Sequence, residues 1–167
     1  MKSAKASLVI KNRSFGVIDI ENLVGGSDNV NPRICKALQK CLDNLFGNLP
    51  IMWVAATGPN AVRNHHLLAF DFPGVRLLRR AGIDGADECL AEVLTEEPAS
   101  RRSTQIIIVG GDKRMIPCAR DLKTNGRRIV IVGRRGSIAR GLLEIADEVH
   151  YFSPYAQINN SHLEGGI

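Results

Sequence analysis

Short apolar runs alternate along this chain with stretches whose apolar residues recur at helical spacing, and this alternation limits the fold more than any other feature. The apolar runs are continuous, which is typical of strands buried on both faces of a sheet. The stretches between them predict helices that bury one stripe of side chains. Strands and helices in alternation form parallel sheets through right-handed crossovers. We therefore expect an α/β fold, a three-layer α/β/α sandwich around a mainly parallel, doubly wound sheet.

The expected elements follow one another without an internal repeat or a linker, so the sequence predicts one domain. Strands are expected at residues 14–20, 51–56, 75–78, 106–109 and 129–132, with an edge strand at 148–152. Helices are expected at residues 32–46, 59–69, 113–124 and 137–145, with a further helix that begins at a cap on Asp84. Asn31 before Pro32 predicts an N-cap followed by proline at the first helical position. The domain then spans residues 14–152, between a flexible basic arm at 1–13 and a loose polar tail at 153–167.

Composition excludes several classes of protein. A chain of 167 residues suits a single domain that buries its own core. The apolar runs are far shorter than the ~20 residues that span a membrane. The apolar stretch after the basic N-terminus is too short for a signal peptide, so we expect a cytoplasmic protein without a membrane partner. The four cysteines form no CxxC pair, which favours reduced thiols packed in helices over a zinc site or disulfides.

Charge is unevenly distributed along the chain. From Arg101 to Arg140 there are eleven Lys and Arg residues and two acids, a net charge of +9 that leaves −4 for the rest. Such a basic block suits a polyanionic partner, most commonly a phosphate backbone. The alternative is a solvated charged face without a partner. Aromatic residues make up 5% of the chain, so phosphate contacts rather than base stacking are expected to dominate recognition.

Four aspartates are expected at one edge of the sheet. Open parallel sheets bind ligands beyond the carboxyl ends of their strands. Asp19 lies near the end of the first strand and Asp112 directly follows the fourth, so the two face each other if the strand order is 3-2-1-4-5. Asp84 and Asp87 begin the helix that leaves the third strand at the same edge. Such convergence is typical of a Mg²⁺ site, because this ion prefers oxygen ligands and activates water for attack on phosphate.

Structural alternatives exist for three of these acids. Asp84 and Asp112 are each suited to cap a helix, and Asp87 is suited to face the positive end of a helix dipole. Asp19 interrupts the apolar run of the first strand, where an acid is expensive to bury without a function.

Several short motifs follow one another along the chain in a particular order. They are residues 17–23 (VIDIENL), 85–90 (GADECL), 108–112 (IVGGD) and the closing segments 126–132 and 137–152. In that order they resemble the motifs of NYN domains, a branch of the PIN-like nuclease superfamily, over residues 14–152. The resemblance implies a PIN-like fold and a metal-dependent endoribonuclease that cleaves RNA phosphodiester bonds with Mg²⁺ or Mn²⁺.

Site residues follow from this resemblance together with the position of each residue in the chain. Asp19, Asp87 and Asp112 are the expected catalytic metal ligands, with Asp84 as a further ligand. Asn22 is expected to orient a ligand or the substrate. Arg134 and Arg135 in the basic block are expected to hold RNA, and Ser137 to meet a phosphate at a helix start. A homo-oligomer is left open.

One departure from the family pattern affects the activity. A second aspartate usually stands two positions after Asp112, and this chain has Arg114 there, followed by Met115. Either Glu21 or Asp84 compensates, or the site holds a single metal, or catalysis is weak; Arg114 is also suited to clamp a substrate phosphate. The alternative function is a catalytically impaired module that binds RNA or a protein partner. A phosphotransferase or phosphatase is less favoured, because position 21 is glutamate and the usual Asp-x-Asp pair is absent.

Overall fold

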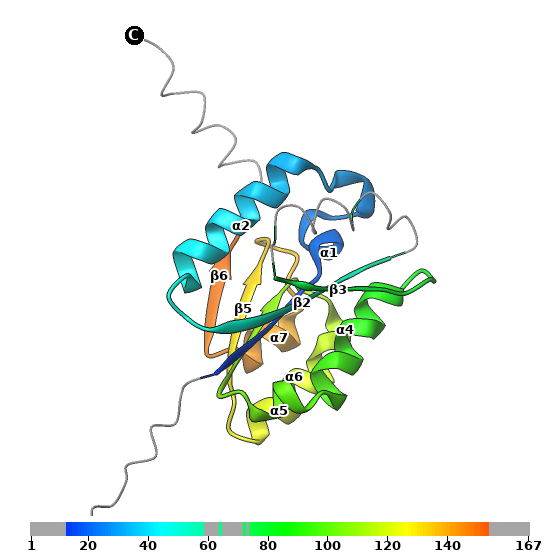
Figure 1. The fold of residues 1–167 in the computed structure, drawn as a ribbon. Helices are drawn as coiled ribbons and strands as arrows, with labels where there is room; N and C mark the ends of the chain where they lie inside the picture. The colour runs from blue at the N-terminus through cyan, green and yellow to red at the C-terminus, as the bar shows by residue number, and fades with distance from the viewer. Residues whose placement is uncertain (1–12, 59–63, 65–71, 73, 154–167) are drawn as a thin grey trace, which may run out of the picture.

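A computed structural model describes residues 13–58, 64, 72 and 74–153. The sheet has six parallel strands in the order β3-β2-β1-β4-β5-β6 (Figure 1). Its strands are β1 (Ser14–Ile18), β2 (Ile51–Thr57), β3 (Arg76–Arg79), β4 (Gln105–Val109), β5 (Arg128–Gly133) and β6 (Glu148–Tyr151). The first five strands have the 3-2-1-4-5 order under which Asp19 and Asp112 face each other, and β6 confirms the expected edge strand. The expected helix at 59–69, except Asn64, lies outside the described residues, as do nearly all of the arm and nearly all of the tail.

Helices cover both faces of the sheet. The described α-helices are α1 (Ile20–Val24), α2 (Pro32–Phe46), α4 (Gly85–Glu96), α5 (Pro98–Arg102), α6 (Ile116–Thr124) and α7 (Arg140–Ile145). The 3₁₀ turns are η1 (Ser27–Asn29) and η2 (Lys113–Met115). In Figure 1, α1 and α2 lie on one face, and α4, α6 and α7 lie on the other. The molecule is therefore the expected three-layer α/β/α sandwich.

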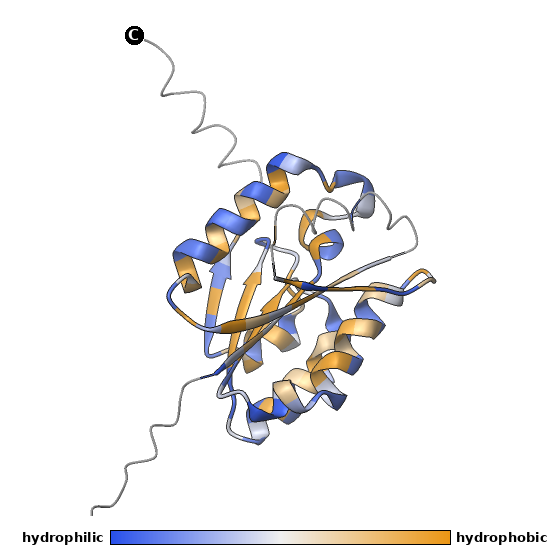
Figure 2. Ribbon diagram, in the orientation of Figure 1, coloured by the Kyte–Doolittle hydropathy of each residue, from blue (hydrophilic) through white to orange (hydrophobic). Residues whose placement is uncertain are grey.

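Two hydrophobic cores explain why the strands are continuous apolar runs. Successive residues of a strand point to opposite faces, so Ile106 and Ile108 pack with α4 and α6, whereas Ile107 and Val109 pack with α1 and α2. Both faces of β4 are thus buried, and Figure 2 shows the apolar strands between helices whose outer faces are polar. Both cores leave the ends of the strands free to carry polar residues.

Several element boundaries differ from the sequence-based expectation. The strand expected at 14–20 ends at Ile18, because Asp19 caps the short helix α1, which the sequence analysis missed together with α5. The helix expected at 113–124 begins with the 3₁₀ turn η2 and becomes α6 at Ile116. The predicted N-cap is confirmed: the Asn31 side chain accepts a hydrogen bond from the Ile34 backbone N–H at 3.1 Å.

The helix expected at 137–145 begins only at Arg140, so the prediction that Ser137 starts a helix is wrong. The Ser137 hydroxyl donates a hydrogen bond to the Arg134 carbonyl at 2.9 Å, which closes a turn. The Ala139 backbone N–H donates to the Gly111 carbonyl at 2.9 Å. Residues 137–139 therefore form a turn and a bend that pack against the loop after β4, and a helix would lose this contact.

Two further findings concern composition. All four cysteines are free and lie in α2, α4 and α6, as expected for reduced thiols. Burial raises the pKa of the Cys118 thiol, which keeps it protonated. Within the described part of the chain, no helix is long and apolar enough to span a membrane.

Candidate active site

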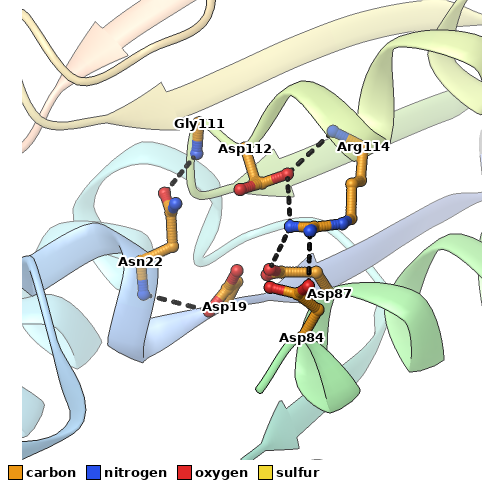
Figure 3. A network of polar contacts seen from close by, with 7 residues as sticks. All are labelled: Asp19, Asn22, Asp84, Asp87, Gly111, Asp112 and Arg114. Carbon is orange, nitrogen blue, oxygen red and sulfur yellow. Dashed lines mark hydrogen bonds and ion pairs between the residues drawn. The ribbon is translucent and has the colours of Figure 1, made fainter. Parts of the chain in front are cut away.

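Four aspartates meet at the carboxyl edge of the sheet, and we call Asp19, Asp84, Asp87 and Asp112 the acidic cluster. The last residues of β1 and β4, Ile18 and Val109, are register partners, so the chain segments that follow them leave the sheet side by side. The first turn of α4 brings the other two aspartates to the same place. Figure 3 shows the four carboxylates gathered around one small region. The structure thus brings together all the acids that the sequence analysis selected.

Asp19 is the buried member of the acidic cluster, with 4% of its surface exposed. Its Oδ1 accepts a hydrogen bond from the Asn22 backbone N–H at 3.1 Å and so caps α1. Its Oδ2 is buried without a hydrogen-bond partner among the described residues. Asp19 therefore has a structural role through one oxygen and none through the other.

The environment of Asp19 disfavours its ionised form. Burial is the largest cause that raises the pKa of Asp19 well above its ordinary value. A hydrogen bond to Asp87, which can form only when one of the two carboxyl groups is protonated, and the charge of Asp87 raise the pKa further. Only the Asn22 backbone N–H opposes them. Two ionised carboxylates have no proton to share, so Oδ2 gains a partner only when one of the pair is protonated or a cation lies between them.

Asn22 positions the loop that carries Asp112. Its side-chain Oδ1 accepts a hydrogen bond from the Gly111 backbone N–H at 2.8 Å (Figure 3). The preceding Gly110 has a φ of 139°, where side chains are strained, and a Cβ there would lie 3.2 Å from the Asp19 Cβ. Asn22 thus joins α1 to the end of β4 and keeps Asp19 and Asp112 on adjacent segments.

Arg114 lies inside the acidic cluster. Its guanidinium forms ion pairs with Asp84 at 2.6 Å, with Asp87 at 3.2 Å and with Asp112 at 3.6 Å (Figure 3). Its backbone N–H also donates to Asp112 Oδ1 at 2.8 Å, so Asp112 caps η2, which is the structural role that the sequence offered as an alternative for this acid. Asp84 occupies the N-cap position of α4 but makes no capping hydrogen bond, because its carboxylate is turned to Arg114. The predicted start of the helix at Asp84 is therefore confirmed, but the expected capping hydrogen bond of its side chain is wrong.

Glu21 has a different partner set from the aspartates. It accepts hydrogen bonds from the Gly58 backbone N–H at 3.3 Å and from the Asn64 side chain at 3.0 Å. These bonds fasten α1 to the segment after β2. Both donors are neutral, and Glu21 also lines the cleft beside Asp19 and Asp87, so its compensation for the missing aspartate stays a prediction. The sequence analysis missed the role of Asn64, since no local pattern links residues 43 positions apart.

An open cleft of about 570 Å³ lies beside the acidic cluster. It is lined by Asp19, Glu21, Asn22, Gly25, Gly26, Ser27, Gly58, Ile83, Ala86, Asp87, Arg134 and Ser137. Arg134 packs its guanidinium against Gly25, where a Cβ would lie 3.1 Å from Nη2. Ile83 is 98% exposed, an unusual position for a large apolar residue. The cleft therefore combines carboxylates, one arginine and one apolar side chain in reach of solvent.

The basic block does not form a single patch of free charge. Within the described residues, four of its eleven basic residues pair with carboxylates: Arg114 with the acidic cluster, Lys123 with Asp147, Arg128 with Glu148 and Arg140 with Glu144. Arg135 stacks over the ring of Tyr151 at 4.3 Å. Arg134 and Arg135 follow β5 at the same edge of the sheet as the acidic cluster. These two arginines are thus the part of the block that lies nearest the cleft.

A divalent cation fits part of this arrangement. No group of three His, Cys, Asp or Glu side chains among the described residues is spaced to hold a metal ion. Asp19 Oδ2 nevertheless lacks a partner, and Asp87 lies beside it. Two carboxylates with water and substrate phosphate are a usual ligand set for Mg²⁺. The donor set therefore fits one hard cation at Asp19 and Asp87.

Comparison with known proteins gives the fold and no family. No family model matches the chain, and no curated protein matches it. A similar solved structure is that of a protein of unknown function from Vibrio parahaemolyticus, with a TM-score of 0.62 and 15% sequence identity. The match covers 88% of this chain and 96% of the Vibrio protein. At this identity the similarity shows a shared α/β fold alone, and the resemblance to NYN domains stays a prediction from the motifs.

Proposed function

We propose that this protein is a metal-dependent ribonuclease that cleaves RNA phosphodiester bonds at the acidic cluster. The observation that carries the proposal is the buried Asp19 carboxylate, whose Oδ2 has no partner among the described residues although Asp87 lies beside it. Burying such a group is costly, and a perturbed carboxylate in a cleft is a common sign of a functional site. Asp19 and Asp87 would hold Mg²⁺ or Mn²⁺, which would supply charge neutralisation and an activated water.

Each residue around the cleft has a distinct role in this proposal. Asp19 and Asp87 hold the cation, and Asp112 lies next to them on the segment that Asn22 positions. Arg134 contributes positive charge inside the cleft, where it holds a substrate phosphate, and Arg135 extends the phosphate path along the same edge. The turn at Ser137 supports Arg134 through its hydrogen bond to the Arg134 carbonyl.

The test is cleavage of labelled single-stranded RNA by the purified protein with Mg²⁺, with Mn²⁺ and with EDTA. We expect cleavage that requires the metal and that falls ~100-fold or more in Asp87→Asn, because catalytic electrostatic contacts contribute on this scale. Asp121→Asn is the matched control, since Asp121 is exposed on α6 and its side chain accepts a hydrogen bond from Asn125. RNA that remains intact under all metal conditions contradicts the proposal.

A second candidate function is an RNA-binding module that does not cleave. The position of Arg114 favours it, because the guanidinium pairs with three of the four carboxylates that a nuclease would use. The same assay separates the two candidates: a binding module retards RNA in a gel and leaves its length unchanged with every metal.

A further inference from the structure

The guanidinium of Arg114 divides the acidic cluster into two unequal parts. Its contacts go to Asp84 Oδ2, Asp87 Oδ2 and Asp112 Oδ1, and these side chains are 41%, 17% and 19% exposed. Asp19 makes no ion pair with it among the described contacts and is the buried member. The guanidinium thus neutralises the outer part of the cluster and reaches Asp87 through one oxygen, while the buried Asp19 carboxylate has no described ion pair with it.

The local fold holds Arg114 in this position. Its backbone N–H is bonded to Asp112, and the next residue, Met115, is buried in the core that α4 and α6 share. Gly111 packs against the backbone of Ser137 and Ile138, so the loop has little freedom to shift. A planar guanidinium also suits this place better than an ammonium, because its two Nη atoms reach separate carboxylates. Arg114 is therefore a fixed part of the cluster rather than a mobile surface side chain.

We propose that Arg114 is a built-in cation that occupies one of two cation positions in the acidic cluster, so that the protein binds a single divalent ion, at Asp19 and Asp87. This inference rests on the metal site of the proposed function. The guanidinium uses one oxygen each of Asp84, Asp87 and Asp112, and so leaves Asp19 Oδ2 as the unneutralised position. A fixed charge of +1 next to Asp87 also weakens binding at that remaining position.

The test measures binding of Mn²⁺ alone by isothermal titration calorimetry, without RNA and without an activity assay. The wild type is expected to bind one ion per chain. Arg114→Met removes the charge at similar length and is expected to bind two ions, or one ion ~10-fold or more tightly, because three carboxylates lose their cation. Lys113→Met is the matched control, since it removes an equal charge from the exposed neighbouring position. It is expected to keep one site with an affinity within about threefold of the wild type.

A second variant covers the case in which Arg114→Met does not fold. Arg114→Gln combined with Asp84→Asn keeps the net charge of the cluster and releases Asp87 and Asp112, so it is expected to bind Mn²⁺ more tightly than the wild type. If the wild type binds one ion and both variants bind as it does, the inference is wrong and the metal site stands. If the wild type binds none and Arg114→Met binds one, Arg114 fills the only position, and the proposed function fails with the inference. If no variant binds Mn²⁺, the metal site itself is refuted.

Discussion

Replacing the buried carboxylate of Asp19 by an amide is expected to stabilise the metal-free protein. In Asp19→Asn the side-chain oxygen still accepts the hydrogen bond from the Asn22 backbone N–H, so the cap of α1 is kept. The new amide N–H₂ lies where Oδ2 has no partner and can donate to Asp87. A repulsive pair is thereby replaced by a hydrogen bond of similar shape.

The size of this stabilisation follows from the Asp19 Oδ2 atom, which has no hydrogen-bond partner among the described residues. Leaving a buried polar group without a partner costs about 1–3 kcal/mol. For a domain of this size each kcal/mol moves the melting temperature by about 2–4 °C. Asp19→Asn is therefore expected to melt about 2–12 °C above the wild type near pH 7.5 in EDTA, by differential scanning calorimetry.

The pH dependence of stability independently checks that Asp19→Asn stabilises the protein rather than destabilising it. Because the folded protein raises the pKa of Asp19 above its ordinary value of 3.8, the folded state holds this proton more tightly than the unfolded chain. The contribution of Asp19 to stability is thus fully present below pH 3.8 and is lost as the pH rises through the raised pKa. The advantage of Asp19→Asn should be small near pH 4 and greatest at neutral pH.

Two comparisons make this prediction refutable. Asp43→Asn, on the exposed face of α2, should show no such growth of stability with pH. Addition of Mg²⁺ should raise the melting temperature of the wild type and have little effect on Asp19→Asn, because only the native wild type binds the ion. A variant that melts at or below the wild type from pH 6 to 8 refutes the account of Asp19 as a strained carboxylate.

Two other variants test the RNA path and the loop that carries Asp112. Filter-binding assays at several salt concentrations give the slope of log affinity for single-stranded RNA against log salt. Arg134→Glu combined with Arg135→Glu should flatten this slope by ~0.7 for each lost phosphate contact. The control Arg102→Glu should leave the slope unchanged, because Arg102 is exposed on α5 near the opposite edge of the sheet. An unaltered slope in the double variant places the RNA elsewhere. Asn22→Ala removes the acceptor for the Gly111 backbone N–H and should lower stability by about 1–3 kcal/mol in urea unfolding, with Asn44→Ala on exposed α2 as the control. A loss of under about 0.5 kcal/mol shows that the loop is held by other contacts.

The fold could be predicted because its causes are local or follow from general rules of topology. Continuous apolar runs require burial on both faces, and alternating strands and helices then lead to a parallel sheet. The cap at Asn31 depends on residues within one helical turn, so its sequence signal is complete. Asp19 could be selected for a similar reason, because an acid inside an apolar run is costly wherever the rest of the chain lies.

The chemistry of the site was decided only by tertiary contacts. Arg114 reaches Asp87 across 27 positions, and Asn22 reaches Gly111 across 89, so no window of sequence contains both partners of either pair. The charge of the basic block also depends on tertiary contacts. Asp147 and Glu148 lie outside the block in the sequence, but in the folded protein they form ion pairs with Lys123 and Arg128. Ser137 could begin a helix by its local pattern, but the backbone contact of residues 137–139 with Gly111 excludes it. The sequence alone determined where charged groups leave the sheet, and packing decided which of them meet, because ion pairs depend on distance in space rather than on separation along the chain.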